Sequence, residues 1–289
     1  MTNKKLEWKR VLIFFVLSYA LTWIPAIIMN KTIGYENYFA WTKYTLLNMY
    51  LMLAPAIANV LTRLITKEGL KESFLRLHLK KNVKYYLSAV FFPPVCSIIS
   101  GALISVFWGK LDFAASFEEY SPMFMLGISL TVISMAVPQA FYCFGEEFGW
   151  RAYLYPKLEK LLGTPAAIII GGIIWGIWHA PLTVEGHNFG TDYWGFPWLG
   201  IIMMSIFCIT VGAVLMWLTK RTGSVYPAAI AHAAINGANL MPLFANGYQE
   251  DLNAFNVFIA EMIPMAAVGI CADVILCRKP KAIQEAAAE

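Results

Sequence analysis

The sequence has 289 residues, of which 59% are hydrophobic and only 14% are charged, and its mean hydropathy is +0.59. Average soluble domains and disordered chains are both more polar, so this composition excludes them. The net charge of +4 arises from basic residues in short segments between apolar stretches, which argues against nucleic-acid binding. The composition therefore predicts a multi-pass membrane protein.

Eight apolar stretches follow one another along the chain. A hydrocarbon core of ~30 Å is crossed by a helix of ~20 residues, and most of the stretches have about this length. We predict an all-α polytopic bundle of about eight spans, forming a single domain over residues 1–289. The predicted spans are Val11 to Asn30, Tyr44 to Ile65, Tyr85 to Trp108, Pro122 to about Phe144, Ala166 to Leu182, Trp198 to Leu218, Val225 to Phe244 and Ala254 to Leu276.

The first stretch follows the basic segment KKLEWKR, which is also typical of a cleaved secretory leader. Its apolar run is long, contains Trp23 and Pro25, and ends without a convincing small-x-small cleavage site. We interpret it as a retained first span.

Lysine and arginine are distributed unevenly between alternate loops. If the N-terminus is cytoplasmic, 19 of the 22 basic residues lie on the inner side, and Lys31, Lys43 and Lys110 lie outside. The positive-inside rule predicts this asymmetry when both termini are cytoplasmic. In a bacterium, the protein is expected in the plasma membrane.

The inner loop from Lys67 to Lys84 is longer than the other connections. Its Leu70, Phe74 and Leu77 recur at helical spacing among lysines, which is typical of an amphipathic segment on a membrane surface.

Charged residues follow the fourth apolar run in the segment GEEFGWR, which contains Glu146, Glu147 and Arg151. A charge within a bilayer costs from a few to more than about ten kcal/mol, so an intramembrane carboxylate is a functional-site hypothesis. Glu147 and Arg151 are four residues apart and therefore share a helix face.

Two of the four histidines are also embedded in apolar sequence, namely His179 in WGIWHAPL and His232 in AIAHAAINGAN. Asn236 follows His232 by four residues, so both side chains project from one helix face.

The break Gly-Thr-Pro at residues 163–165 predicts a helical hairpin that places Glu146 opposite His179. This register requires the fourth helix to shift or bend at Pro138 and to continue to Lys160. In the alternative register the apolar run spans alone, the glutamates lie at the inner boundary, and His179 has no partner.

These polar residues allow a structural and a chemical interpretation. In the first, Glu147 and Arg151 form a buried ion pair and the histidines hydrogen-bond between helices. In the second, a carboxylate and an imidazole take a proton from water, while imidazole and carboxamide N–H groups stabilise an oxyanion. A serine or cysteine nucleophile is disfavoured: the five cysteines match no metal or disulfide spacing, and Cys143 is the one thiol near Glu146.

The polar residues form three ordered motifs, each on a separate predicted span. They resemble the EExxxR, [F/W]xxxH and HxxxN motifs of the CPBP family, which comprises CAAX-processing endopeptidases and bacteriocin-processing or bacteriocin-immunity proteins of the Abi type. The motif core covers about residues 122–246. The matching residues are Glu146, Glu147 and Arg151, then Trp175 and His179, then His232 and Asn236.

The resemblance implies an intramembrane glutamate-type endopeptidase whose site opens to the cytoplasm and whose substrate is a membrane-associated peptide or protein. It implies the following roles: Glu146 as general base, His179 as the residue that positions the water, His232 and Asn236 as oxyanion donors, Glu147 and Arg151 as a supporting pair, and Trp175 as a packing residue.

Several alternatives remain. His179, His232 and a glutamate would suit a His₂Glu zinc site, although the HExxH spacing is missing, so we expect no metal and no other cofactor. A non-catalytic immunity or scaffold protein would keep the fold, and a transporter would use buried acids such as Glu261 and Asp273. A CAAX tail, a peptide pheromone, a bacteriocin leader or another membrane protein are the possible substrates.

Overall fold

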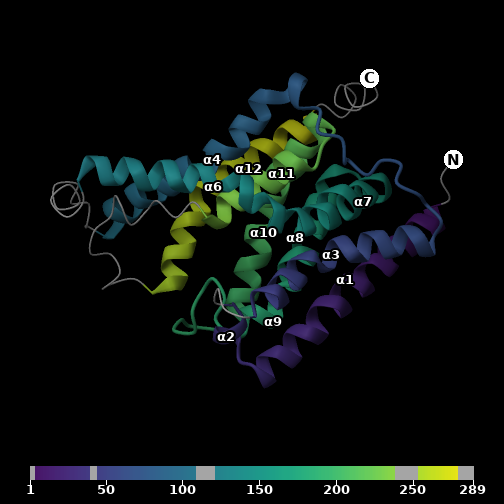
Figure 1. The fold of residues 1–289 in the computed structure, drawn as a ribbon, viewed down its shortest axis with the longest axis horizontal. Coiled ribbons are helices and arrows are strands. Elements are labelled where there is room, and N and C mark those ends of the chain that lie inside the picture. The colour runs from purple at the N-terminus through teal and green to yellow at the C-terminus, as the bar shows by residue number, and fades with distance from the viewer. Residues whose placement is uncertain (1–3, 40–43, 109–120, 238–252, 279–289) are drawn as a thin grey trace.

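The computed structural model describes residues 4–39, 44–108, 121–237 and 253–278, which form helices, turns and irregular segments with no strand among them. Over the described residues, every predicted span contains a helix, so the all-α prediction is confirmed (Figure 1). The elements are α1 (Lys4–Thr32), α2 (Tyr35–Phe39), α3 (Thr45–Ile65), α4 (Leu79–Trp108), α6 (Pro122–Gly149), the π-helix η1 (Trp150–Leu154), α7 (Tyr155–Leu162), α8 (Thr164–Trp178), α9 (Ala180–Thr183), α10 (Trp198–Thr222), α11 (Tyr226–Gly237) and α12 (Ala254–Arg278).

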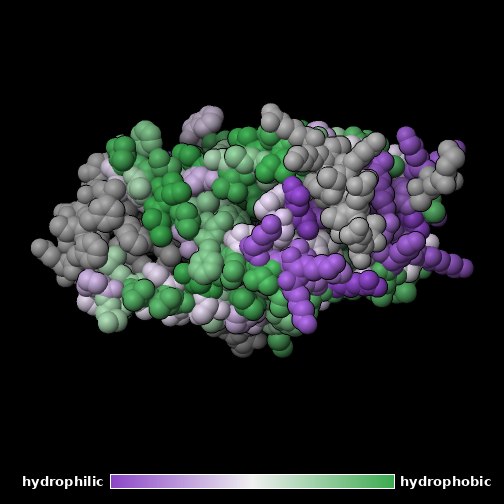
Figure 2. All heavy atoms as spheres, turned by 90° about the horizontal axis from the view of Figure 1, so that it is seen from above, coloured by the Kyte–Doolittle hydropathy of each residue, from purple (hydrophilic) through white to green (hydrophobic). Residues whose placement is uncertain are grey.

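Within the described residues, six helical runs are long and apolar enough to cross a membrane, and α6, η1 and α7 together form one of them over Pro122–Leu162. The apolar helix α8 is shorter. The predicted seventh span begins as α11, and its part beyond residue 237 lies outside the described residues. Figure 2 shows hydrophobic side chains over the middle of the bundle and hydrophilic ones gathered toward one end. The protein is therefore a multi-pass integral membrane protein.

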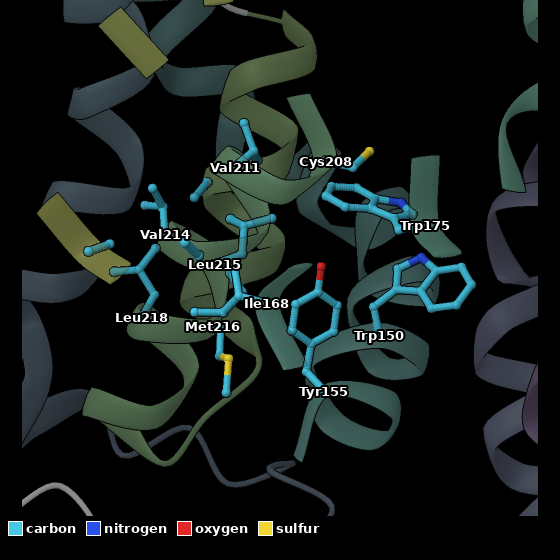
Figure 3. Packing of buried hydrophobic residues seen from close by; sticks show 14 of the residues in the cluster. Trp150, Tyr155, Ile168, Trp175, Cys208, Val211, Val214, Leu215, Met216 and Leu218 are labelled. Atoms are coloured by element: carbon cyan, nitrogen blue, oxygen red, sulfur yellow. The ribbon is translucent and has the colours of Figure 1, made fainter. Parts of the chain in front are cut away.

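The segments that carry the predicted site residues lie inside the bundle, whereas the first half of α6 is largely exposed. Helix α6 packs between α3 and α11, while α8 packs against α10. In Figure 3, the aromatic side chains of Trp150, Tyr155 and Trp175 lie beside buried aliphatic residues of α10, which include Val211 and Leu215. This core surrounds the segment that follows the two glutamates.

The first turn of α1 and the last turn of α12 lie at the same end of the bundle. Lys157 of α7 contacts Glu7 of α1, and Lys220 of α10 contacts Glu159 of α7. Cys277 of α12 lies near the latter pair. Both ends of the described chain thus share one side, while the cytoplasmic orientation stays a prediction.

The predicted amphipathic segment is wrong for residues 66–78, which form turns and irregular structure before α4 begins at Leu79. Leu70 and Leu77 are exposed, whereas Phe74 packs beside Val225. The physical reason is a competing set of hydrogen bonds: Arg63 donates to the carbonyls of this segment, including that of Gly69 at 2.8 Å, and these bonds hold it outside a helical ladder.

Candidate active site

The helix that carries the glutamates continues well beyond the apolar run, as the preferred register requires. However, its departure from α-helical geometry lies at η1, after the glutamates, and not at Pro138, so that part of the prediction is wrong. The cause is Pro156, which has no N–H to offer the carbonyl of Ala152 and whose ring would clash with that carbonyl in an α-helix. The turn widens instead, and the N–H of Tyr155 bonds to the Trp150 carbonyl.

The hairpin turn lies where the sequence predicts it. Helix α7 ends at Leu162, Gly163 has a φ of +86°, and α8 begins at Thr164. A positive φ of this kind is readily adopted by glycine alone. The return path brings α8 beside α6, and the indole Nε1 of Trp175 donates to Oε2 of Glu146 at 2.8 Å. The predicted hairpin is present, but its register differs from the prediction by one turn, because Glu146 bonds to Trp175 and not to His179.

Trp175 contacts residues of all three motifs. Its ring centroid lies 5.9 Å from that of His179 and 5.5 Å from that of His232. The guanidinium carbon of Arg151 lies 3.9 Å from the centre of the same ring, within the range of a cation–π interaction. Trp175 is therefore more than the packing residue that the sequence predicts, because it also holds the Glu146 carboxylate.

His179 is half-buried at the end of α8. Its Nδ1 lies 2.9 Å from the Trp175 carbonyl, and since a carbonyl only accepts, Nδ1 carries the hydrogen. In the neutral imidazole, Nε2 then has a lone pair that can accept from a water. The edge of this ring also contacts Trp178, with centroids 4.8 Å apart.

Glu147 joins the α6 and α11 motifs. Its Oε1 accepts from Nδ1 of His232 at 2.7 Å and from the Arg151 guanidinium at 3.2 Å. The Arg151 guanidinium lies near the Tyr155 ring at 4.9 Å as well as near Trp175. The predicted Glu147–Arg151 pair is thus present and fully buried.

Asn236 also faces α6, as its spacing from His232 predicts. Its side-chain nitrogen donates to the sulfur of Cys143 at 3.7 Å. This is a weak hydrogen bond, whose length reflects the large radius of sulfur. Asn236 is exposed while His232 is 5% exposed, so the HxxxN motif extends from the interior to the surface of the described bundle.

Six of the seven predicted site residues form one connected cluster, and Asn236 instead contacts Cys143 of α6. Glu146, Glu147, Arg151 and Trp175 are buried at 3% exposure or less. A separate apolar cavity of about 650 Å³ lies between α4 and α12, and none of the seven residues lines it. Residues of all three motifs therefore meet inside the bundle, with Asn236 outside this contact, whereas the opening of the site to the cytoplasm and the chemical roles stay predictions.

The zinc alternative requires His179, His232 and a glutamate to direct their ligand atoms at one point. Over the part of the chain that the structure describes, no three His, Cys, Asp or Glu side chains come together as a metal-binding group. The residues do not fit a His₂Glu zinc site in this arrangement.

Three features that shape the site were not predicted from the sequence. The indole N–H of Trp175 was foreseeable, because a buried tryptophan usually finds an acceptor. Pro156 was a visible signal for a disturbed turn. Asn59 of α3, which donates to the Phe148 carbonyl at 2.7 Å, had no signal in the motif segments.

The fold and this cluster define a multi-pass helical membrane protein with carboxylates and imidazoles inside the bundle. A family model described as type II CAAX prenyl endopeptidase, Rce1-like, matches residues 128–238. The chain is 25% identical over 236 residues to CAAX prenyl protease 2 of Methanococcus maripaludis, covering 77% of this chain and 79% of that protein.

The chain is also similar to proteins named lysostaphin resistance protein A. It is 27% identical over 235 residues to that of Staphylococcus epidermidis, covering 79% of this chain and 53% of the relative. It is 30% identical over 129 residues to that of Staphylococcus haemolyticus, covering 43% of this chain and 33% of the relative. The chain therefore spans about half the length of the Staphylococcus epidermidis relative. It spans about one third of the Staphylococcus haemolyticus relative. The chain is thus similar to a CAAX-type endopeptidase and to these resistance proteins, and the family match over residues 128–238 supports a CAAX-type intramembrane protease.

Proposed function

We propose that this protein is an intramembrane endopeptidase that hydrolyses a peptide bond in a membrane-associated peptide or protein, using water activated by Glu146. The observation that carries the proposal is that Trp175 holds both proton acceptors: its N–H binds Glu146 and its carbonyl binds His179. A carboxylate and an imidazole lone pair, linked here through one tryptophan, are groups that can bind and deprotonate a water.

The proposed reaction proceeds without an acyl-enzyme. Glu146 accepts a proton from water while His179 orients it, and the water oxygen forms a bond to the peptide carbonyl carbon. The C–N bond then breaks, and the amine leaves with the proton from Glu146. The products are a new carboxylate and a new amine.

The oxyanion of the intermediate is assigned to His232 and Asn236. Because Nδ1 of His232 donates to Glu147, Nε2 of His232 can donate only when the ring is an imidazolium. Glu147 supplies the negative charge that stabilises this form. Asn236 has a second N–H beside the one directed at Cys143, and this N–H is the further proposed donor.

The test compares wild type with Glu146→Gln on a fluorogenic, farnesylated peptide that ends in a CAAX sequence, in proteoliposomes. Loss of a general base is expected to lower kcat by about 10³-fold. The products are mapped by mass spectrometry, with isotopically heavy water oxygen expected in the new carboxylate. Equal cleavage by Glu146→Gln and wild type would overturn the mechanism.

The same variant addresses the substrate and the alternatives. Membrane peptides that are retained by Glu146→Gln but cleaved by wild type identify the substrate class, whether CAAX-type, pheromone or leader peptide. Tight binding without cleavage by either protein would favour the non-catalytic immunity or scaffold alternative. One tightly bound zinc per chain, together with loss of activity in a chelator, would favour the zinc-dependent alternative.

A further inference from the structure

The π-helical turn η1 leaves backbone groups that its own helix cannot satisfy. Pro156 has no N–H, so the carbonyl of Ala152 loses the partner that an α-helix would supply. A buried backbone group without a partner is costly, so the groups around η1 need donors from elsewhere.

Helix α3 supplies these donors from two residues on one face. Asn59 donates to the Phe148 carbonyl at 2.7 Å, and Arg63 reaches the Ala152 carbonyl at a longer 3.5 Å. Arg63 also donates to Oδ1 of Asn59 at 2.7 Å, which orients the carboxamide so that its NH₂ faces Phe148. Asn59 is fully buried, so no bulk water can replace it.

The contact between α3 and α6 is close enough to fix this geometry. A Cβ added to Gly145 would lie 2.5 Å from the Met52 carbonyl oxygen, and one added to Gly149 would lie 2.4 Å from Cβ of Pro55. The two helices therefore touch backbone to backbone on both sides of Glu146 and Glu147. Small residues at four-residue spacing permit this approach in membrane bundles.

We propose that Asn59, oriented by Arg63, is a positioning residue of the active site. By holding the Phe148 carbonyl, Asn59 keeps the turn between Glu147 and Arg151 in the geometry that directs both side chains toward His232. Asn59 does not touch the reacting groups. This inference rests on the proposed function for its kinetic consequence, whereas its structural part can be tested separately.

The experiment uses the full chain in proteoliposomes with Asn59→Leu, which removes the donor at similar volume, and Asn59→Asp, which keeps an acceptor for Arg63. Thr62→Val is the matched control, because Thr62 is equally buried on α3 but its hydroxyl donates to the Ala58 carbonyl of its own helix. The substrate is the farnesylated CAAX probe.

Both Asn59 variants are expected to lower kcat by about 10- to 100-fold with KM within about twofold, since small misplacements of catalytic groups cost rates of this size. Thr62→Val is expected to stay within about twofold of wild type. In a Glu147→Gln background, Asn59→Leu is expected to cost little further, because the group that it positions is already lost. The same fractional loss in both backgrounds would overturn the proposal.

A second measurement separates this inference from the proposed function. Proteins labelled with 5-fluorotryptophan report on Trp150, which is buried within η1 and is assigned by Trp150→Phe. The Trp150 fluorine signal is expected to shift in both Asn59 variants and not in Thr62→Val. An unchanged signal in the Asn59 variants would overturn the inference even if no probe is cleaved, whereas cleavage by Glu146→Gln would overturn only the proposed mechanism.

Discussion

One end of the bundle holds the first turn of α1 and the last turn of α12, and we call it the inner end because the predicted topology places it in the cytoplasm. This end and the site both bury carboxylates, but the two regions neutralise them differently. At the inner end, Glu7 is 5% exposed and contacts both Arg10 and Lys157, the latter at 2.9 Å. Glu68 of the adjoining segment likewise contacts Lys157 at 2.5 Å and Arg10 at 3.3 Å. Each of these carboxylates faces two cations.

At the site, the adjacent residues Glu146 and Glu147 have different partners. Glu147 follows the pattern of the inner end, since Arg151 and His232 both contact it. The recorded hydrogen-bond donor to Glu146 is the neutral indole of Trp175. Because a buried charge needs compensation, a carboxylate held by a neutral donor is a poor structural element and a good candidate for chemistry. The comparison thus separates Glu146 from the other buried acids.

The largest expected difference is between two single variants, Glu146→Gln at the site and Glu7→Gln at the inner end. Glu146→Gln is expected to lower kcat by about 10³-fold and to leave the thermal midpoint unchanged or higher. Glu7→Gln is expected to lower the free energy of unfolding by about 3 kcal/mol, because it breaks a buried pair, with kcat retained per folded molecule. Thermal unfolding and probe cleavage are measured on both proteins.

The comparison would fail if the two variants lost activity and stability in parallel. Such a result would mean that Glu146 is one more member of a structural network.

Arg151→Lys is expected to have the next largest effect. A lysine keeps the charge but loses the planar group that lies between the Trp175 and Tyr155 rings, so Glu147 and His232 lose their alignment. We expect kcat to fall by about 10²-fold. Arg10→Lys in the inner network is the matched control, and an equal loss of activity in both variants would contradict a special role for Arg151.

Trp175→Phe tests the single neutral donor to Glu146. Hydrogen bonds to charged groups contribute about 1.5–3 kcal/mol, so kcat is expected to fall about 10- to 100-fold, while the ring still covers Arg151. Trp178→Phe removes a comparable buried bond, from Nε1 to Thr22 at 2.8 Å, away from Glu146. Its kcat should stay near that of wild type. A larger loss in Trp178→Phe would reverse the assignment.

The smallest effect concerns His187, in the segment between α9 and α10 and outside the predicted spans. Burial lowers the pKa of His187 from 6.5 to about 3, and its Nδ1 lies 2.8 Å from the Tyr35 hydroxyl. The unfolded chain therefore binds the proton more readily, so stability is full above a pH of about 6.5 and falls as the pH is lowered toward 3.

The thermal midpoint of wild type, measured across this pH range, is expected to decline more steeply than that of His187→Gln. Equal slopes for the two proteins would show that His187 does not contribute.

Much of the fold followed from patterns that are local in the chain. Apolar runs predict membrane helices because a bilayer leaves few other ways to satisfy the backbone. The four-residue spacing of Glu147 and Arg151, and of His232 and Asn236, predicted shared faces, and the structure pairs both faces with the expected neighbours. The break at Gly163 set the register of α8 against α6 to within one turn.

The misses were of a different kind. Leu70, Phe74 and Leu77 have helical spacing, yet the carbonyls of their segment bind Arg63, a residue of the preceding helix. The bend was predicted at Pro138, whereas the helix departs from α-helical geometry just before Pro156. At that turn, side chains of α3 donate to the carbonyls of Phe148 and Ala152. In each case a distant side chain decided between local structures that were both possible.

The order of residues determined that this is a helical membrane protein and that three polar motifs share its interior, because hydropathy and helical periodicity act over short distances. Only the tertiary structure decided which of two neighbouring glutamates receives cations and which receives an indole. That choice depends on the side chains that α8 and α11 present at α6, and helix packing alone brings those side chains together.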